Sequence, residues 1–174
     1  DELRASVLRV QLAKLPQITE SMHRSKYRIR QALKEFSGIS LRRIVDGAGD
    51  TSPFLITTYR DSETAIKVNK ALRAEGIVTH PQGISNILMT DWGFHLYYNI
   101  ASLVQMTSVD LGGFPWNLTE NAGLRMQYRK GVCPVADSLF ERSILLPIPS
   151  ALTEQDESDI IRAFKKVHVA LLSS

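Results

Sequence analysis

The chain has 174 residues, of which 44% are hydrophobic and 22% charged, and its formal net charge is +3. This composition is typical of one globular domain with a sizeable core, and so small a net charge does not by itself indicate a nucleic-acid partner. The sequence contains no apolar run of the roughly 20 residues that a membrane span needs, no visible secretory leader and a single cysteine, which excludes an internal disulfide framework, so we expect a cytoplasmic protein.

The first element that the sequence predicts is a long helix. The opening "DELRASVLRVQLAKL" is periodic from its first residue, and the helical spacing of apolar residues continues past Pro16 to Phe36. Gly38 is typical of a helix stop. We therefore expect one long, bent helix over residues 1–37, of the kind that joins two domains. Because the chain starts inside this pattern and without Met, we also expect that another segment precedes it.

The next elements alternate between strands and helices. Turn residues, β-branched runs and helical periods predict, in order, strands at Ile39–Ile44 and Phe54–Tyr59, a helix at Ser62–Glu75, weaker strands at Ile77–Thr79 and Ile84–Thr90, and an aromatic-rich helix over 92–106. Ser62 is a candidate N-cap, and Gly76 stands where a left-handed C′ residue is wanted. From Thr107 to Gly131 no period holds, and a segment of that length is often functional.

The C-terminal part closes this arrangement. Pro134 is expected to start a short helix through Phe140, followed by a strand at Ser143–Ile148 whose Pro147 and Pro149 suit a strand end or a sheet edge. Thr153 should cap a helix that runs to Leu172. Residues 38–174 thus predict a small α+β domain, with an antiparallel sheet of three to four strands that two helices, Ser62–Glu75 and Thr153–Leu172, cover on one face.

A basic stretch admits two interpretations. It comprises Arg24, Lys26, Arg28, Arg30, Lys34, Arg42 and Arg43, with only Glu35 to oppose them. The stretch over 24–43 could bind nucleic acid or another polyanion, or it could be a solvated helix face whose acidic partners lie elsewhere in the chain. We favour the second interpretation, because no nucleic-acid-binding motif accompanies the charges, and keep a non-catalytic binding module as the alternative function.

Few residues predict chemistry on their own. His95 is the best single candidate, since histidine can donate, accept or transfer protons near neutral pH, and Tyr97 and Tyr98 add hydroxyl groups suited to a polyol. The alternative is a partly buried aromatic helix. Cys133 could lie at a helix N-terminus, but a buried apolar filler is the commoner role. The spacing of cysteine and histidine predicts no metal site, and there is no glycine-rich phosphate loop.

Three segments resemble the DegT-type sugar aminotransferases. The opening "DELRASVLRVQLAKL" is similar to the interdomain helix of that family, and "GDTSPFLITTYRDSETAIKVNKALRAEGI" resembles its small domain. The closing "YRKGVCPVADSLFERSILLPIPSALTEQDESDIIRAFKKV" looks like its last strand and helix, with matching positions at Cys133, Pro134, Asp137, Leu139, Arg142, Leu146 and Pro147. The resemblance covers nearly all of this chain but only about two-fifths of a full enzyme.

This resemblance implies a homodimeric enzyme that uses pyridoxal phosphate and has the aspartate-aminotransferase fold. Such an enzyme moves an amino group from an amino-acid donor, usually glutamate or glutamine, onto a keto-sugar. The large cofactor-binding domain and its lysine would lie upstream, so no catalytic or cofactor-binding residue is assigned here, and the dimer would form through that domain and the first helix. His95, Tyr97, Tyr98 and Trp116 are the expected substrate contacts. A regulator that keeps the fold without the lysine remains a further alternative.

Overall fold

The sheet at the centre of the molecule is antiparallel. The computed structural model describes residues 1–78, 86–93, 95–122 and 127–173. Its four strands are β1 (Ser40–Leu41), β2 (Phe54–Thr58), β3 (Ile87–Leu88) and β4 (Ser143–Pro147), and their order is β1-β2-β4-β3. The long central pair aligns Phe54 with Pro147 and Thr58 with Ser143. The expected α+β class with a small antiparallel sheet is confirmed.

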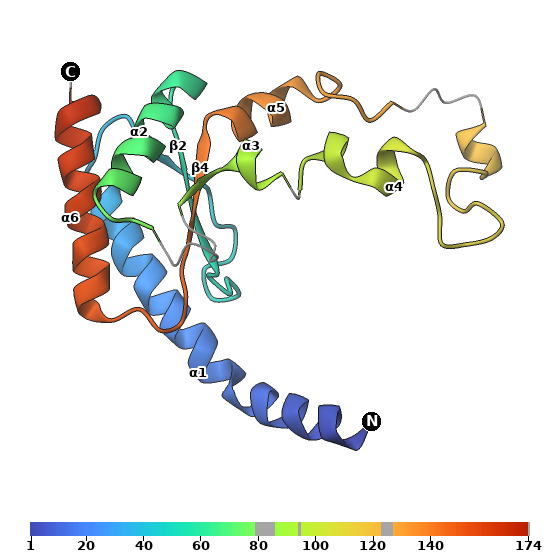
Figure 1. Cartoon of the computed structure of the whole chain (residues 1–174), viewed down its shortest axis with the longest axis horizontal. Helices are drawn as coiled ribbons and strands as arrows, with labels where there is room; N and C mark the ends of the chain where they lie inside the picture. The colour runs from blue at the N-terminus through green and yellow to red at the C-terminus, as the bar shows by residue number, and fades with distance from the viewer. Residues whose placement is uncertain (79–85, 94, 123–126, 174) are drawn as a thin grey trace.

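The helices differ greatly in length (Figure 1). They are α1 (Glu2–Leu33), α2 (Ser62–Ala74), α3 (Met89–Trp92), α4 (Ala101–Val104), α5 (Pro134–Glu141) and α6 (Glu154–Leu171), with 3-10 turns η1 (Tyr97–Asn99) and η2 (Thr119–Asn121). Of these, α1, α2 and α6 lie together on one side of the molecule. None of the described helices combines the length and the hydropathy that a bilayer span requires. The segments between α3 and α5 lie away from α6 and the sheet, and we call residues 97–122 and 127–133 the arm.

One face of the sheet, which we call the closed face, carries the hydrophobic core. Side chains alternate along a strand, so Leu55 of β2 and Ile144 and Leu146 of β4 all point to this side. The helices α2 and α6 cover it, as the sequence predicts, and the second half of α1 joins them through Ile29 and Leu33, both fully buried. Three helices therefore close this face instead of the two expected.

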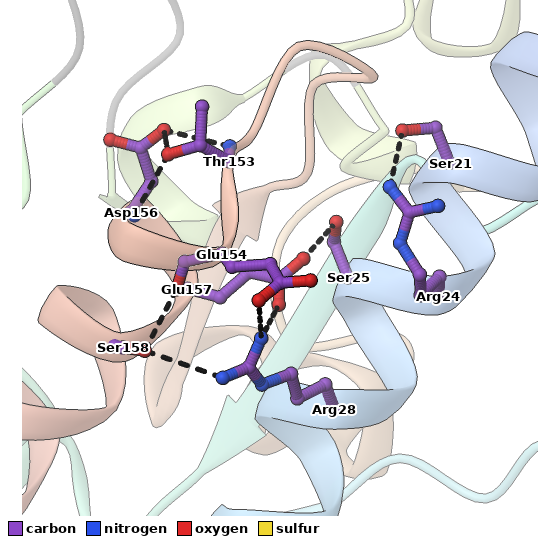
Figure 2. A network of polar contacts seen from close by, with 9 residues as sticks. All are labelled: Ser21, Arg24, Ser25, Arg28, Thr153, Glu154, Asp156, Glu157 and Ser158. Carbon is purple, nitrogen blue, oxygen red and sulfur yellow. Dashed lines mark hydrogen bonds and ion pairs between the residues drawn. The ribbon is translucent and has the colours of Figure 1, made fainter.

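A polar network fastens α1 to α6 (Figure 2). The carboxylate of Glu157, which is only 1% exposed, accepts hydrogen bonds from the Ser25 hydroxyl at 2.6 Å and from Nη1 of Arg28 at 2.8 Å. At the start of the same helix, the Thr153 hydroxyl accepts from the backbone N–H of Asp156, whose carboxylate accepts in turn from the Thr153 N–H. This capping box confirms Thr153 as the N-cap of the closing helix.

The first half of α1 stands apart from this core. Its apolar side chains Leu3, Val7, Leu8, Val10, Leu12 and Leu15 are 47–76% exposed. The helix runs through Pro16 without a break, and it curves along its length in Figure 1. A proline removes one backbone hydrogen bond and bends a helix, so one continuous, bent helix forms as expected. It ends at Leu33, however, and does not extend to the expected stop at Gly38.

Several local expectations are wrong. Residues 92–106 do not form one helix, because Gly93, with φ of 68°, ends α3 after one turn and only short turns follow. Asp61, and not Ser62, caps α2, since its carboxylate accepts from the Thr64 N–H at 2.7 Å. Cys133 is exposed at the N-cap of α5, so it is not a buried filler but does lie at a helix N-terminus. Pro147 does end its strand, as one of its two expected places, but β4 is an inner strand and not a sheet edge.

The predicted strands also differ in length from the observed ones. Of the range Ile39–Ile44 only Ser40–Leu41 pairs as β1, and Ile77 and Val78 form no strand. Ile87 and Leu88 form β3, whereas residues 79–85 lie outside the described part of the chain.

Candidate functional site

The face of the sheet opposite the core is the candidate site, and we call it the open face. Phe54, Ile56 and Thr58 of β2, which alternate with buried residues, point to this side. Ser143 and Leu145 of β4 line the same side, although both are buried. None of the long helices in the described part of the chain contributes a residue to this side. Instead these side chains form the floor of a groove of about 650 Å³. That volume lies within the range of small-molecule sites.

Short segments from distant parts of the chain make the walls of the groove. They contribute Ser40 and Leu41 from β1, Arg42 directly after it, Met89 and Trp92 from α3, His95 after α3, Leu139 and Phe140 from α5, and Arg142. The α5 helix begins at Pro134, because a proline is well tolerated in the first turn of a helix, where its missing N–H would have no partner. Much of the wall is apolar, with a few polar side chains converging on it, which is typical of a ligand site.

An aromatic cluster lies at one side of the groove. The ring of Trp92 lies 5.5 Å from the ring of Phe54 and 4.6 Å from that of His95, which meets it edge-on. The left-handed Gly93 allows the chain to turn back directly after Trp92, as few other residues would. The cluster gives the groove a half-buried flat apolar surface beside an exposed imidazole.

The charged residues of the groove are all basic. Arg42 is exposed and Arg142 half-buried, and Nη1 of Arg142 donates to the backbone carbonyl of Tyr59 at 2.9 Å. Among the described residues that line the groove there is no carboxylate. A cleft lined by charges of one sign concentrates ligands of the opposite sign, so this groove favours anions.

The four expected substrate contacts do not gather in one place. His95 lines the groove, but Tyr97 lies outside its lining and holds the arm against α5. The Tyr97 hydroxyl accepts from the Cys133 N–H and donates to the Asp137 carboxylate, both at 3.1 Å. The Gly131 N–H also donates to Asp137, at 2.8 Å. Tyr97 and Asp137 therefore position the start of α5, and with it one wall of the groove.

Tyr98 and Trp116 belong to the arm. Tyr98 lines a second hollow of about 460 Å³ with Tyr128 and Lys130 among its neighbours. Nε1 of Trp116 donates to the Thr107 carbonyl at 3.2 Å, and its ring lies 5.9 Å from that of Tyr128. A hydrogen bond and the negative charge of Glu141, 2.6 Å away, raise the pKa of Lys130 above its ordinary value.

Sequence reasoning missed most of the groove. Phe54, Trp92, Arg42 and Arg142 were not singled out as ligand contacts, although all four line it. The one available signal is the alternation in β2, which separates Phe54, Ile56 and Thr58 from the buried residues between them. That alternation shows that one face of the strand is free of the core, but it does not show what lies across from it.

The basic stretch is partly neutralised inside the molecule. The Lys26 ammonium is only 3% exposed and lies 2.6 Å from the Asp50 carboxylate, and Arg28 binds Glu157. Acidic partners from elsewhere in the chain thus meet two of the cations, as the solvated-face interpretation requires. The structure leaves less continuous positive surface over 24–43 than the sequence suggests, and we do not propose nucleic-acid binding.

A pyridoxal phosphate site does not fit the groove as it stands. The cofactor needs a lysine for its Schiff base, and none of the described lining residues is a lysine. The buried Lys26 is engaged by Asp50 and lies outside the groove lining. We therefore assign no cofactor step to these residues. Within the described ranges, no three histidine, cysteine or acidic side chains cluster as metal ligands do.

The comparisons with known proteins concern the fold. No protein-family model matches the chain, and no curated protein matches its sequence. Solved structures do match. Aminotransferase TlmJ from Streptoalloteichus hindustanus has a TM-score of 0.63 and 18% identity over 97% of this chain and 37% of its own. A DegT DnrJ EryC1 StrS aminotransferase from Brucella abortus has a TM-score of 0.59 and 21% identity over 94% of this chain and 35% of its own.

A third match is a candidate sugar aminotransferase from Streptococcus pneumoniae, solved in an apo form and a PMP form. It has a TM-score of 0.58 and 19% identity over 94% of this chain and 34% of its own. This chain thus spans about a third of the length of the structures it matches. The resemblance read from the sequence is confirmed at the level of the fold: the chain has the fold of the C-terminal portion of DegT-type sugar aminotransferases.

Proposed function

We propose that this chain is the C-terminal part of a pyridoxal-phosphate-dependent aminotransferase. The enzyme would transfer an amino group from an amino-acid donor, glutamate or glutamine, to a keto-sugar. Residues 1–37 would be the helix between two domains and residues 38–174 the small domain. The support is a likeness of fold to sugar aminotransferases over 94–97% of the chain, one of which has been solved in a PMP form.

The observation that carries the proposal is the division of the sheet into a closed face and an open face. The closed face packs its own helices, whereas the open face presents a groove with His95 and two arginines. In the proposed enzyme this groove forms the substrate-side wall of the active site, opposite a large domain that holds the cofactor. The exposed apolar half of α1 is the surface that would pack on that domain or on a second subunit, as in a homodimer.

The test compares two proteins: the full-length product of the reading frame that contains these residues, and the 174-residue chain alone. We expect the full-length protein to purify with the absorbance of bound pyridoxal phosphate, and glutamate or glutamine to convert that spectrum to the pyridoxamine form. The 174-residue chain should show neither change. A full-length protein that neither binds the cofactor nor reacts with any amino donor would contradict the proposal.

The same comparison tests where the cofactor lies. Stoichiometric binding of pyridoxal phosphate by the 174-residue chain would contradict the placement of the cofactor site in another segment. If the full-length protein binds the cofactor but performs no half-reaction, the regulator that keeps the fold without the lysine becomes the better account.

A further inference from the structure

The groove on the open face combines an apolar floor with positive charge at its rim. The floor includes Phe54, Ile56 and Leu145, and the charge comes from Arg42 and Arg142. No carboxylate from the described lining residues opposes these arginines. The ligand that complements such a site has an apolar surface on one side and at least one negative charge.

Arg42 lines the groove and has no carboxylate partner among the described residues, unlike the cations that are paired within the chain. Lys26, Arg28 and Arg162 each hold a carboxylate of this chain within 2.6–2.8 Å. The guanidinium of Arg42 is exposed at the groove and is held by no described carboxylate. The Arg42 N–H donates to the Ile56 carbonyl at 3.5 Å, beside the strand pair β1–β2, so the residue starts from the edge of the sheet. An exposed guanidinium without a carboxylate partner offers parallel N–H groups that match a carboxylate or a phosphate.

The aromatic cluster offers the complementary surface. The half-buried Trp92 is buttressed by Phe54, and the exposed His95 lies edge-on to it. A broad ring packs well against the C–H face of a sugar ring, while hydroxyl groups reach the polar atoms of His95, Ser40 and Thr58 around it. The volume of about 650 Å³ accommodates one or two sugar rings.

We propose that the groove binds an anionic sugar, with its carboxylate or phosphate on Arg42 and its ring against Trp92. The C–H face of the sugar ring packs on the apolar floor, and the acid group supplies the negative charge that Arg42 and Arg142 at the rim attract. That this ligand is the amino acceptor rests on the proposed function. The binding itself depends only on the groove and is measured without any amino transfer.

The experiment measures the binding of three probes to the full-length protein by calorimetry and ligand-detected NMR. The probes are glucuronate, a phosphorylated glucose and neutral glucose. The variant Arg42→Gln removes the charge, and Arg43→Gln is its matched control, because Arg43 is also exposed but does not line the groove. A third variant, Trp92→Leu, removes the flat ring.

We expect at least one anionic probe to bind about tenfold more tightly than glucose, which is the effect of one charge-assisted hydrogen-bond pair. Arg42→Gln should abolish the preference for the anionic probe, and Arg43→Gln should keep it. Trp92→Leu should weaken the binding of all three sugars. Comparing the affinities for glucuronate and for phosphorylated glucose identifies which acid group the groove binds. Equal binding of glucose and the anions, no binding of any probe, or equal behaviour of the two arginine variants would overturn the inference.

The outcome is separable from that of the proposed function. Cofactor absorbance and the half-reaction with glutamate are measured on the same wild-type preparation. A protein that binds anionic sugars through Arg42 but performs no half-reaction would refute the enzyme and keep the site. A protein that transfers amino groups while Arg42→Gln retains the probe preference of the wild type would refute the site and keep the enzyme.

Discussion

The two faces of the sheet are built from the same strands but serve different ends. On the closed face Leu55, Ile144 and Leu146 are at most 5% exposed under three helices. On the open face their neighbours Phe54, Ile56 and Thr58 are only half-buried and line a groove. Because successive side chains of a strand point to opposite faces, one residue can contribute to the stability of the core while the next contributes to the groove. Substitutions one position apart should therefore have different consequences.

The largest expected effect comes from neighbouring residues of β2. Leu55→Ala should lower the free energy of unfolding by about 3 kcal/mol, because it leaves a cavity in a packed core. Ile56→Ala, on the open face, should cost only about 1 kcal/mol, since its side chain is half-buried. Urea unfolding of both variants provides the measurement. Equal losses would mean that the open face is as tightly packed as the closed one.

The second effect tests what holds α1 on the closed face. Glu157→Gln should lower the free energy of unfolding by about 2 kcal/mol, since the buried carboxylate loses its charged bond with Arg28. The control is Glu154→Gln, whose carboxylate is 88% exposed and lies 3.9 Å from the same arginine, and it should cost less than about 0.5 kcal/mol. Similar values for the two variants would argue against the network of Figure 2 as the fastening of α1.

A smaller, pH-dependent effect should come from Asp50. Burial opposes its ionisation, but hydrogen bonds from Lys26 and Ser52 and the charge of Lys26 outweigh burial and hold the pKa of that carboxyl below its ordinary value. A lowered folded-state pKa gives stability that is fully present above the unfolded-state pKa, about 4, and is lost as the pH falls through the folded-state value.

Chemical unfolding of the wild type and of Asp50→Asn between neutral pH and about pH 3 isolates this contribution. The difference in unfolding free energy between the two proteins should be constant near neutral pH and should shrink below about pH 4. A difference that does not change with pH would show that Asp50 gains nothing from Lys26.

The smallest effect on stability should come from the open face itself. His95 is exposed, so His95→Gln should change the free energy of unfolding by less than about 0.5 kcal/mol. If the groove is the substrate wall, the same variant should raise the KM for the sugar acceptor several-fold in the full-length enzyme. Loss of stability without any change in KM would place His95 with the structural residues instead.

The sequence predicts the elements whose signals are local. Alternation predicts the β2 strand, and helical periods predict the α2 and α6 helices. The Thr153 cap and the left-handed Gly76 follow from the contacts that each residue type makes with the neighbouring backbone. Asp61 precedes Ser62 and both can cap, so propensity alone does not choose between them. The aromatic segment fails as a helix because Gly93 adopts φ of 68°, which no periodicity reveals.

The candidate site is less predictable, because it is assembled from β1, β2, α3, α5 and β4. His95 reaches the groove, whereas Tyr97, two residues later, forms hydrogen bonds with Asp137 and Cys133. Neighbouring residues in an irregular segment can take quite different partners, and the sequence does not encode which. Arg42 shows the same limit: it belongs to a basic stretch, but only the fold separates it from the cations that are paired internally.

The shortness of β1 and β3 has a consequence for solubility during folding. Each outer strand contributes only two residues to the ladder, while the five-residue strands β2 and β4 are paired with each other inside the sheet. A strand from another molecule that paired with β1 or β3 could extend a ladder of only two residues. Strand addition at these two outer strands is therefore disfavoured, even while the groove stays open.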